Sequence, residues 1–192
     1  KFKSYYEHNN TYFTDITSAK QGYWFGFLMG DGWITKKMDI GCESIDHEHM
    51  VKLKKVIGGR SRKLKIKKAK KKSCKDTMVF GIYDKQLAKD LIRLGFIPGK
   101  GKSERCKINF DLIPEEFHSD VFRGLFDADG SLMPYVDKEK SKKGGISRIE
   151  LKGSEANIKL FIKYIRKFGY EGNGQTIPKL NKDGQKIGTQ WL

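Results

Sequence analysis

The sequence has little of what defines several common protein classes. It contains three cysteines, Cys42, Cys74 and Cys106, and this odd number at a spacing that fits no zinc template predicts free thiols in a reducing compartment. No apolar run approaches the ~18 residues that cross a bilayer. The chain opens KFKSYYEHNN, without the apolar segment of a secretory signal. These features argue against a disulfide scaffold and a membrane-spanning protein, and they predict an intracellular one.

Acidic residues are scarce relative to basic ones. The chain has 39 Lys and Arg against 23 Asp and Glu, a formal net charge of +16. A charge of this size favours a polyanionic partner, either nucleic acid or an acidic membrane surface. Hydrophobic residues make up 38% of the chain, enough to build a core, so a disordered basic tail is excluded.

The order of predicted elements occurs twice along the 192 residues. Residues 1–100 predict a helix over 18–30, two strands, a helix, two strands and a last helix. Residues 101–116 contain Pro, Gly and mixed polar residues, and are predicted to connect two halves. Residues 117–192 repeat the order from a helix over 117–128, ending one helix short. The chain is therefore expected to be an internal duplication.

The first helix of each half ends abruptly in Asp-Gly, at Asp31 and at Asp129. Small residues stand four apart just before, Gly26 and Gly30 in one half, Gly124 and Ala128 in the other. Such spacing leaves a flat stripe on which two helices can approach closely. The aspartates would then lie side by side at two helix C-termini, where both the dipole and the neighbouring charge disfavour ionisation.

A bound divalent cation would relieve this repulsion. One or two carboxylates together with a substrate phosphate suit Mg²⁺, and a paired-carboxylate metal site on a basic protein indicates phosphodiester hydrolysis. The alternative is that Asp-Gly only ends each helix, as Gly commonly does. Two copies, each after a pair of small residues and each opening a similar unit, argue against that alternative.

The segments WFGFLMGDG (24–32) and FRGLFDADG (122–130) resemble the signature helices of the LAGLIDADG homing endonucleases. Two motifs in one chain indicate the monomeric, two-repeat branch of that family. The resemblance implies an α+β fold, a pseudo-twofold duplicated αββαββα half that forms a saddle of two antiparallel β-sheets along the DNA major groove. It also implies that Asp31 and Asp129 bind Mg²⁺ or another divalent cation, each serving cleavage of one strand. Gly30 and Ala128 would supply the neighbouring backbone.

Members of this family often carry a Lys or Gln near the end of the second strand of each half. Lys152 fits that position, since alternation places Ile149 and Leu151 toward the core. In the first half, alignment of the two halves places Cys42 there, whereas alternation exposes Glu43. Neither is basic or an amide, so the two strand cuts could differ in rate. Lys102, in the connector, is a further candidate for the pocket.

Candidate DNA contacts are basic residues of predicted strands and their turns. In RSRKLKIKK, Leu64 and Ile66 are expected to face inward and the lysines outward. About half of the candidates are expected to be solvated surface, and affinity should fall steeply with salt. The full set comprises Lys36, Arg60, Arg62, Lys63, Lys65, Lys67, Lys138, Lys140, Arg148, Lys179, Lys182 and Lys186.

The sequence thus predicts a sequence-specific DNA endonuclease that makes a metal-dependent double-strand break at a long target site, as in the homing of an intron or intein. Its partner would be double-stranded DNA, bound by a monomer. The alternative is an RNA-splicing maturase or a DNA-binding regulator with the same fold and no cleavage. Intron RNA would then be a partner, and metal-independent RNA binding would mark that case. A basic RNA-associated α+β protein without nuclease chemistry is the third interpretation.

Overall fold

The computed structural model describes residues 9–58, 63–71, 73–99, 101–135, 146–171, 174, 176–180 and 186–191. The first half contains α1 (Ala19–Asp31), β1 (Gly32–Ile34), β2 (Asp39–Ser44), α2 (His47–Leu53), continued by the π-helical turn η1 (Lys54–Gly58), β3 (Lys65–Lys67), β4 (Thr77–Tyr83) and α3 (Lys85–Arg93). Short turns follow as α4 (Lys102–Arg105), η2 (Phe110–Leu112) and η3 (Glu115–Phe117). The second half contains α5 (His118–Asp129), β5 (Gly130–Tyr135), β6 (Ile146–Gly153), α6 (Glu155–Arg166), β7 (Thr176–Leu180) and β8 (Lys186–Trp191).

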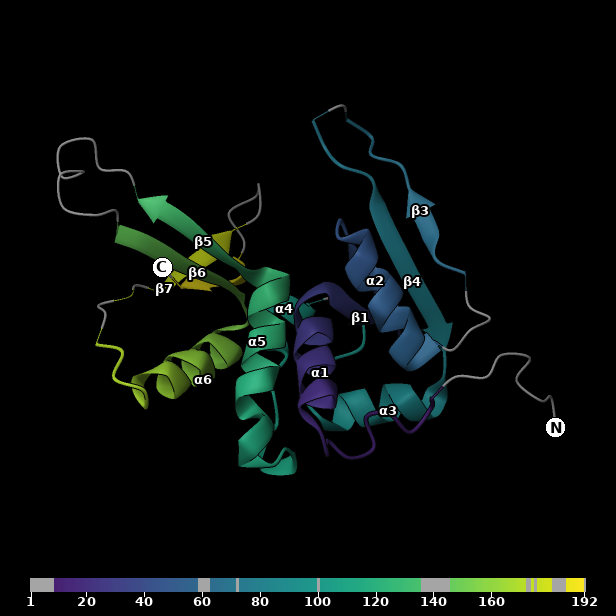
Figure 1. Cartoon of the computed structure of the whole chain (residues 1–192), viewed down its shortest axis with the longest axis horizontal. Helices are drawn as coiled ribbons and strands as arrows, with labels where there is room; N and C mark the ends of the chain where they lie inside the picture. Colours follow the sequence, from purple (N-terminus) through teal and green to yellow (C-terminus); the bar gives the residue numbers. More distant parts are fainter. Residues whose placement is uncertain are drawn as a thin grey trace.

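Each half builds a four-stranded antiparallel sheet with the same strand order. The order is β1-β2-β4-β3 in the first sheet and β5-β6-β8-β7 in the second. Helices α1 and α5 lie side by side between the two sheets, which diverge on either side of them (Figure 1). The predicted α+β duplication with two antiparallel sheets is therefore confirmed.

Helix starts follow from side-chain caps in both halves. Ser18 caps α1 by accepting from the backbone N–H of Gln21, and Ser154 caps α6 by accepting from that of Asn157. Asp84 caps α3 in the same way. These caps satisfy N–H groups that have no partner inside the helix, so each boundary is encoded locally.

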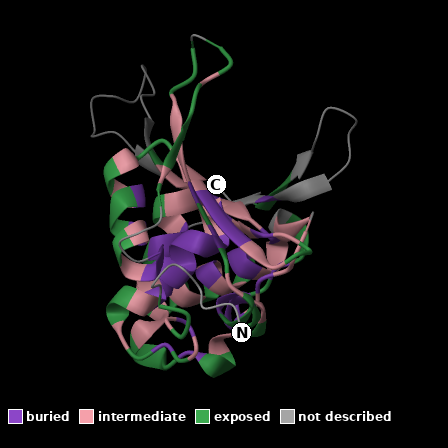
Figure 2. Ribbon diagram, turned by 90° about the vertical axis from the view of Figure 1, so that its right-hand side faces the viewer, coloured by how far each residue is buried: buried purple, intermediate pink, exposed green. Residues whose placement is uncertain are grey.

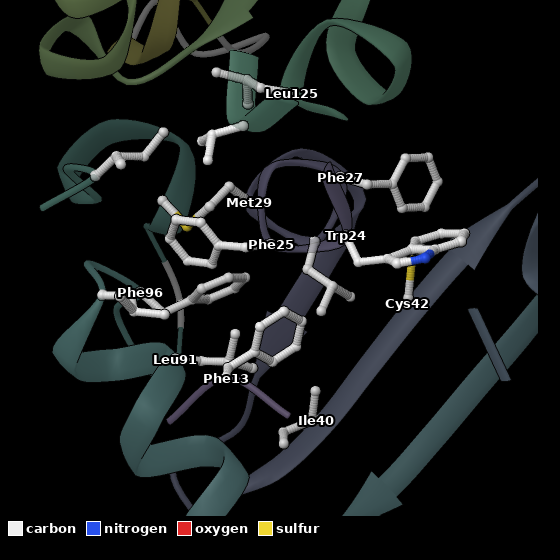
Figure 3. Close-up of a cluster of buried hydrophobic side chains, with 14 of the residues drawn as sticks. Phe13, Trp24, Phe25, Phe27, Met29, Ile40, Cys42, Leu91, Phe96 and Leu125 are labelled. Carbon is white, nitrogen blue, oxygen red and sulfur yellow. The ribbon is translucent and has the colours of Figure 1, made fainter. Parts of the chain in front are cut away.

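The core lies under the first sheet and around α1. Buried residues concentrate at the centre of the molecule, whereas the outer turns are exposed (Figure 2). Phe13, Leu91 and Phe96 pack below α1, where Phe25 of that helix meets Phe13, and Cys42 lies beside Trp24 (Figure 3). Burying an aromatic or Leu side chain contributes ~1.5–3 kcal/mol. This packing fixes α1, and with it the end of the helix that carries Asp31.

The strand around residues 63–67 departs from its predicted pattern. The alternation predicted an inward Ile66, but all three residues of β3 are exposed and Ile66 is 57% exposed. Ile66 pairs with Met78, which packs against the core, so it lies on the inward face as predicted. It is nevertheless exposed, because β3 is the outermost strand of its sheet and pairs only with the start of β4. Leu64 is partly buried against the core.

Candidate functional site

Helices α1 and α5 touch through their glycines. A Cβ atom at Gly26 would lie 1.9 Å from the Val121 carbonyl oxygen, and one at Gly124 would lie 2.0 Å from the Tyr23 carbonyl oxygen. Neither distance is possible for a side chain, so the two backbones approach as closely as glycine allows. Gly22, which the prediction left out, extends the contact one turn earlier, toward Phe117. Gly22 stands four residues before Gly26, and this spacing is the sequence signal that could have identified it as part of the contact.

This contact brings the two helix ends together. Asp31 is the last residue of α1 and Asp129 the last of α5. A Cβ atom at Gly30 would lie 2.4 Å from the Ala128 Cβ and 3.2 Å from Oδ2 of Asp129. The carboxylate of Asp129 therefore lies against α1, next to Gly30, the residue that precedes Asp31. The four residues predicted to form the metal site are adjacent.

The electrostatics at this junction disfavour negative charge. Burial, and after it the charge of Asp129, raise the pKa of Asp31 to about 6 against the opposing charge of Lys102. The helix C-terminus adds partial negative charge at the same place. Two carboxylates held together in this way present a site that a cation would stabilise.

Lys102 reaches the junction from α4. Its Nζ donates hydrogen bonds to the carbonyl oxygens of Gly30 and Gly32, the latter at 2.6 Å. Burial lowers the pKa of Lys102, and the charge of Asp129 offsets that effect most strongly among its neighbours. Lys102 therefore places its ammonium at the end of α1, where its charge interacts with both Asp31 and Asp129.

The sheet registers settle which first-half residue matches Lys152. Gly32 pairs with Cys42 and Gly130 pairs with Leu151, and both partners are fully buried. Cys42 thus corresponds to Leu151, and burial raises the pKa of its thiol to about 12. The Cys42 thiol therefore keeps its proton and serves as an apolar contact in the core.

Glu43 and Lys152 each follow these paired residues, so they occupy corresponding positions with opposite charge. The carboxylate of Glu43 accepts from the Lys67 ammonium at 2.9 Å and from the Thr77 hydroxyl at 2.6 Å. These contacts, first the one from Thr77, lower the pKa of Glu43. In the second half, Nζ of Lys152 lies 3.6 Å from Oε1 of Glu150, a residue that is 4% exposed. The prediction did not include Glu150 or Thr77.

The predicted DNA contacts fall into three groups. Lys65 and Lys67 lie on β3, on the face of the sheet that points away from the core, and Lys63 is exposed just before that strand. Lys36 is also exposed, but it lies in the turn between β1 and β2, at the opposite edge of the sheet. Lys67 is paired with Glu43, as described. The strands β6, β7 and β8 carry Arg148, Lys179 and Lys186, whose side chains lie outside the described part. The remaining candidates lie outside the described residues altogether, namely Arg60, Arg62, Lys138, Lys140 and Lys182.

The donor set at the junction suits Mg²⁺ rather than a metal held in a protein cage. Among the described residues, no group of three or more His, Cys, Asp or Glu side chains comes together. Mg²⁺ is usually held by one or two carboxylates, waters and substrate phosphates, and Asp31 with Asp129 fits that pattern. The Gly30 carbonyl, which accepts from Lys102, keeps a second lone pair.

Within the part of the chain that the structure describes, no helix is long and apolar enough to cross a membrane. No protein-family profile matches the sequence, and neither does any curated protein. A variant of I-SmaMI is similar to this chain with a TM-score of 0.50 at 15% identity, over 88% of this chain and 77% of its own. The homing endonuclease I-WcaI, solved with its DNA recognition sequence, gives a TM-score of 0.52 at 16% identity, over 92% of this chain and 76% of its own.

The chain has the homing-endonuclease fold. The likeness covers nearly the whole chain, and it agrees with the duplicated fold of two antiparallel sheets that the sequence predicted. Because the sequence identities are only 15% and 16%, the similarity establishes the fold and nothing more. The two helices that resemble the family signature form the central contact of that fold (Figure 1).

Proposed function

We propose that this chain is a sequence-specific DNA endonuclease of the LAGLIDADG type, which acts as a monomer and cuts both strands of a long target site. The observation that carries the proposal is the junction of Asp31 and Asp129, held together by helices packed through Gly26 and Gly124. A duplicated fold with one carboxylate per half suits a substrate made of two antiparallel strands. The homing of an intron or intein is the biological setting that this activity implies.

The carboxylates of Asp31 and Asp129 would hold a divalent cation, with backbone carbonyls of Gly30 and Ala128 beside them. When bound, such a cation activates a water molecule and stabilises charge on the scissile phosphate. The chain's own contribution is to keep both carboxylates within reach of that phosphate. Cleavage is therefore expected to require both aspartates and to stop in EDTA.

Lys102 and Lys152 would assist as cations near the reacting groups. Lys102 already lies among the helix ends, with its ammonium on the Gly30 and Gly32 carbonyls. From there it can stabilise negative charge that develops on the phosphate, an effect that is largest where water is excluded. Lys152 would orient water in the second half only, because Glu43 stands at the corresponding position of the first half.

The outward face of the first sheet would bind DNA. Lys63 and Lys65 bring positive charge to that face, beside the ion pair of Lys67 with Glu43, which supports contact with phosphates. Base contacts made from the same strands would give sequence specificity. The second sheet, with the same strand order, would bind the other half of the target.

A cleavage selection tests the proposal. A library of long duplexes is incubated with the full chain and Mg²⁺, with EDTA as the control, and cut ends are sequenced. Asp111→Asn, which changes an exposed aspartate away from the junction, should cut like the unchanged protein. Metal-dependent double-strand cuts at one long site are the expected result. Salt-sensitive DNA binding without cuts would reject the endonuclease, and tight, metal-independent binding to intron RNA would then indicate a maturase.

A further inference from the structure

The outward face of the first sheet contains a hollow of about 510 Å³. Its floor is formed by two glycines that pair across the sheet, Gly41 on β2 and Gly81 on β4. Trp33 pairs with Gly41 from the other side, and a Cβ atom at Gly41 would lie 2.2 Å from its indole ring. The indole therefore rests against Gly41 and closes one end of the hollow.

The other end of the floor is open. A Cβ atom at Gly81 would meet nothing closer than the Ile40 carbonyl oxygen at 4.0 Å. Val79 and Tyr83, two residues to either side along β4, line the hollow, and the Tyr83 residue is 51% exposed. Because side chains two apart on a strand share a face, these groups surround the space above Gly81. The result is a shallow, apolar recess with aromatic walls.

The rim of this recess is cationic, with one carboxylate inside it. Lys63 and Lys65 line the hollow from the β3 side and are exposed. Asp39 lines it as well and accepts from the Thr35 hydroxyl at 3.0 Å. Lysines suit phosphates, and an apolar recess suits the methyl group of thymine, the one apolar group that bases present in the major groove. A carboxylate accepts from an exocyclic amino group, which adenine presents in the major groove beside its paired thymine.

We propose that this hollow reads one A·T pair of the target. The thymine 5-methyl group enters above Gly81 and lies against the indole of Trp33, while Lys63 and Lys65 meet flanking phosphates. This inference rests on the proposed function, since it assigns a base-reading subsite to the sheet that would bind DNA. It makes Trp33 and Gly81 specificity-determining residues.

The substitution Gly81→Ala isolates the subsite. The added methyl group would take the place proposed for the thymine methyl, and the space around it is open, so the fold should tolerate it. Alanine in place of a strand glycine also lowers the entropy of the unfolded chain. Gly153→Ala is the matched control, because Gly153 is a strand glycine in the second sheet with nothing within 4 Å. Equal or higher melting temperatures for both variants would show that neither harms the fold.

Duplexes bound by the full chain in EDTA are selected from a randomised library and sequenced. The unchanged protein and Gly153→Ala should enrich a thymine at one position of the half-site bound by the first sheet. Deoxyuridine at that position, which lacks the methyl group, should weaken binding about fourfold, the value for one buried methyl-sized group. Gly81→Ala should lose both the enrichment and the sensitivity to deoxyuridine at that position alone.

Two results would overturn the inference without contradicting the proposed endonuclease activity. One is a consensus in which deoxyuridine costs less than twofold at every thymine, and the other is equal deoxyuridine sensitivity in Gly81→Ala and in the unchanged protein. Failure to enrich any sequence, with all three proteins folded, would overturn the inference together with the proposed sequence-specific binding.

Discussion

At the scale of single residues, the pair Asp31 and Asp129 is the feature that ordinary folding does not explain. Both carboxylates end helices whose C-termini are already partly negative. Burial and the charge of Asp129 raise the pKa of Asp31 to about 6, and Lys102 only partly offsets them. A pair that lowers the stability of the metal-free protein is expected where a ligand cation completes the site.

The first prediction concerns Asp31→Asn in EDTA, and it follows from the destabilisation of the metal-free protein by the charge on Asp31. The folded protein binds the Asp31 proton more tightly than the unfolded chain, because the pKa rises from 3.8 to about 6 on folding. Stability contributed by this group therefore falls as pH rises through that window and stays low at pH 7. After a discount for partial exposure, removing the charge should stabilise the protein by about 1 kcal/mol, or ~2–4 °C in melting temperature.

Thermal unfolding at pH 4 and pH 7 checks this prediction. The variant should gain over the unchanged protein at pH 7 and show little difference at pH 4, where Asp31 is mostly protonated in the folded state. A variant that melts at a lower temperature at pH 7 would show that the attraction of Lys102 for the Asp31 carboxylate outweighs the effects of burial and of the Asp129 charge.

Lys152 and Glu43 give a second prediction at this scale. They occupy corresponding positions with opposite charge, and Glu43 is already bound to Thr77 and Lys67. Lys152→Met should therefore slow cleavage of one strand much more than the other, by about 10²-fold if the lysine stabilises the transition state. Gels that resolve both labelled strands should then show accumulation of nicked DNA.

Lys159→Met is the control for this substitution, because Lys159 pairs with Glu155 on the surface of α6. It should cut both strands at the rates of the unchanged protein. Equal slowing of both strands by Lys152→Met would contradict an auxiliary role confined to one half.

At the scale of elements, the contact between α1 and α5 decides whether the site exists. Glycine inside a helix costs ~1 kcal/mol relative to alanine, so Gly124→Ala would stabilise an isolated helix. Here the added Cβ would lie 2.0 Å from the Tyr23 carbonyl oxygen and force the helices apart. The steric clash outweighs the gain in helix propensity, because overpacking costs ~1–3 kcal/mol and a backbone carbonyl cannot rotate away from the clash as a side chain can.

We therefore expect Gly124→Ala to lower the free energy of unfolding by about 2 kcal/mol and to impair cleavage. Chemical denaturation measures the first effect. Ser119→Ala, at an exposed position of the same helix, should change stability by less than ~0.5 kcal/mol. An unchanged or higher stability for Gly124→Ala would mean that the helices do not pack through this glycine.

The elements also show what the sequence could predict. Apolar spacing is a local signal, as is the Ser18 cap of α1, so α1 and α5 were predicted to within one residue at each end. The choice between Cys42 and Glu43 required the register of β1 on β2, which depends on pairing across the sheet. Ile66 looked like a core residue because alternation does not reveal that β3 is an outer strand. Lys102 reaches the junction from the short turn α4, and the path of such a turn cannot be predicted from apolar periodicity.

At the scale of the whole molecule, duplication accounts for the arrangement. Two halves with one strand order place their first helices in parallel contact at the centre and their sheets on either side (Figure 1). This brings one carboxylate per half to a common point and leaves a separate sheet for each half of the proposed DNA target. A formal charge of +16 adds the attraction for a polyanion that such a substrate requires.

The measurement that tests the account most directly is strand-resolved cleavage by Asp31→Asn and by Asp129→Asn, on the target found by selection, with Mg²⁺. Each substitution should reduce double-strand cleavage by about 10²-fold or more, since the junction loses one of its two anionic ligands. Target binding in EDTA should survive in both. Double-strand cleavage at the unchanged rate in either variant would contradict a shared site built on the two aspartates.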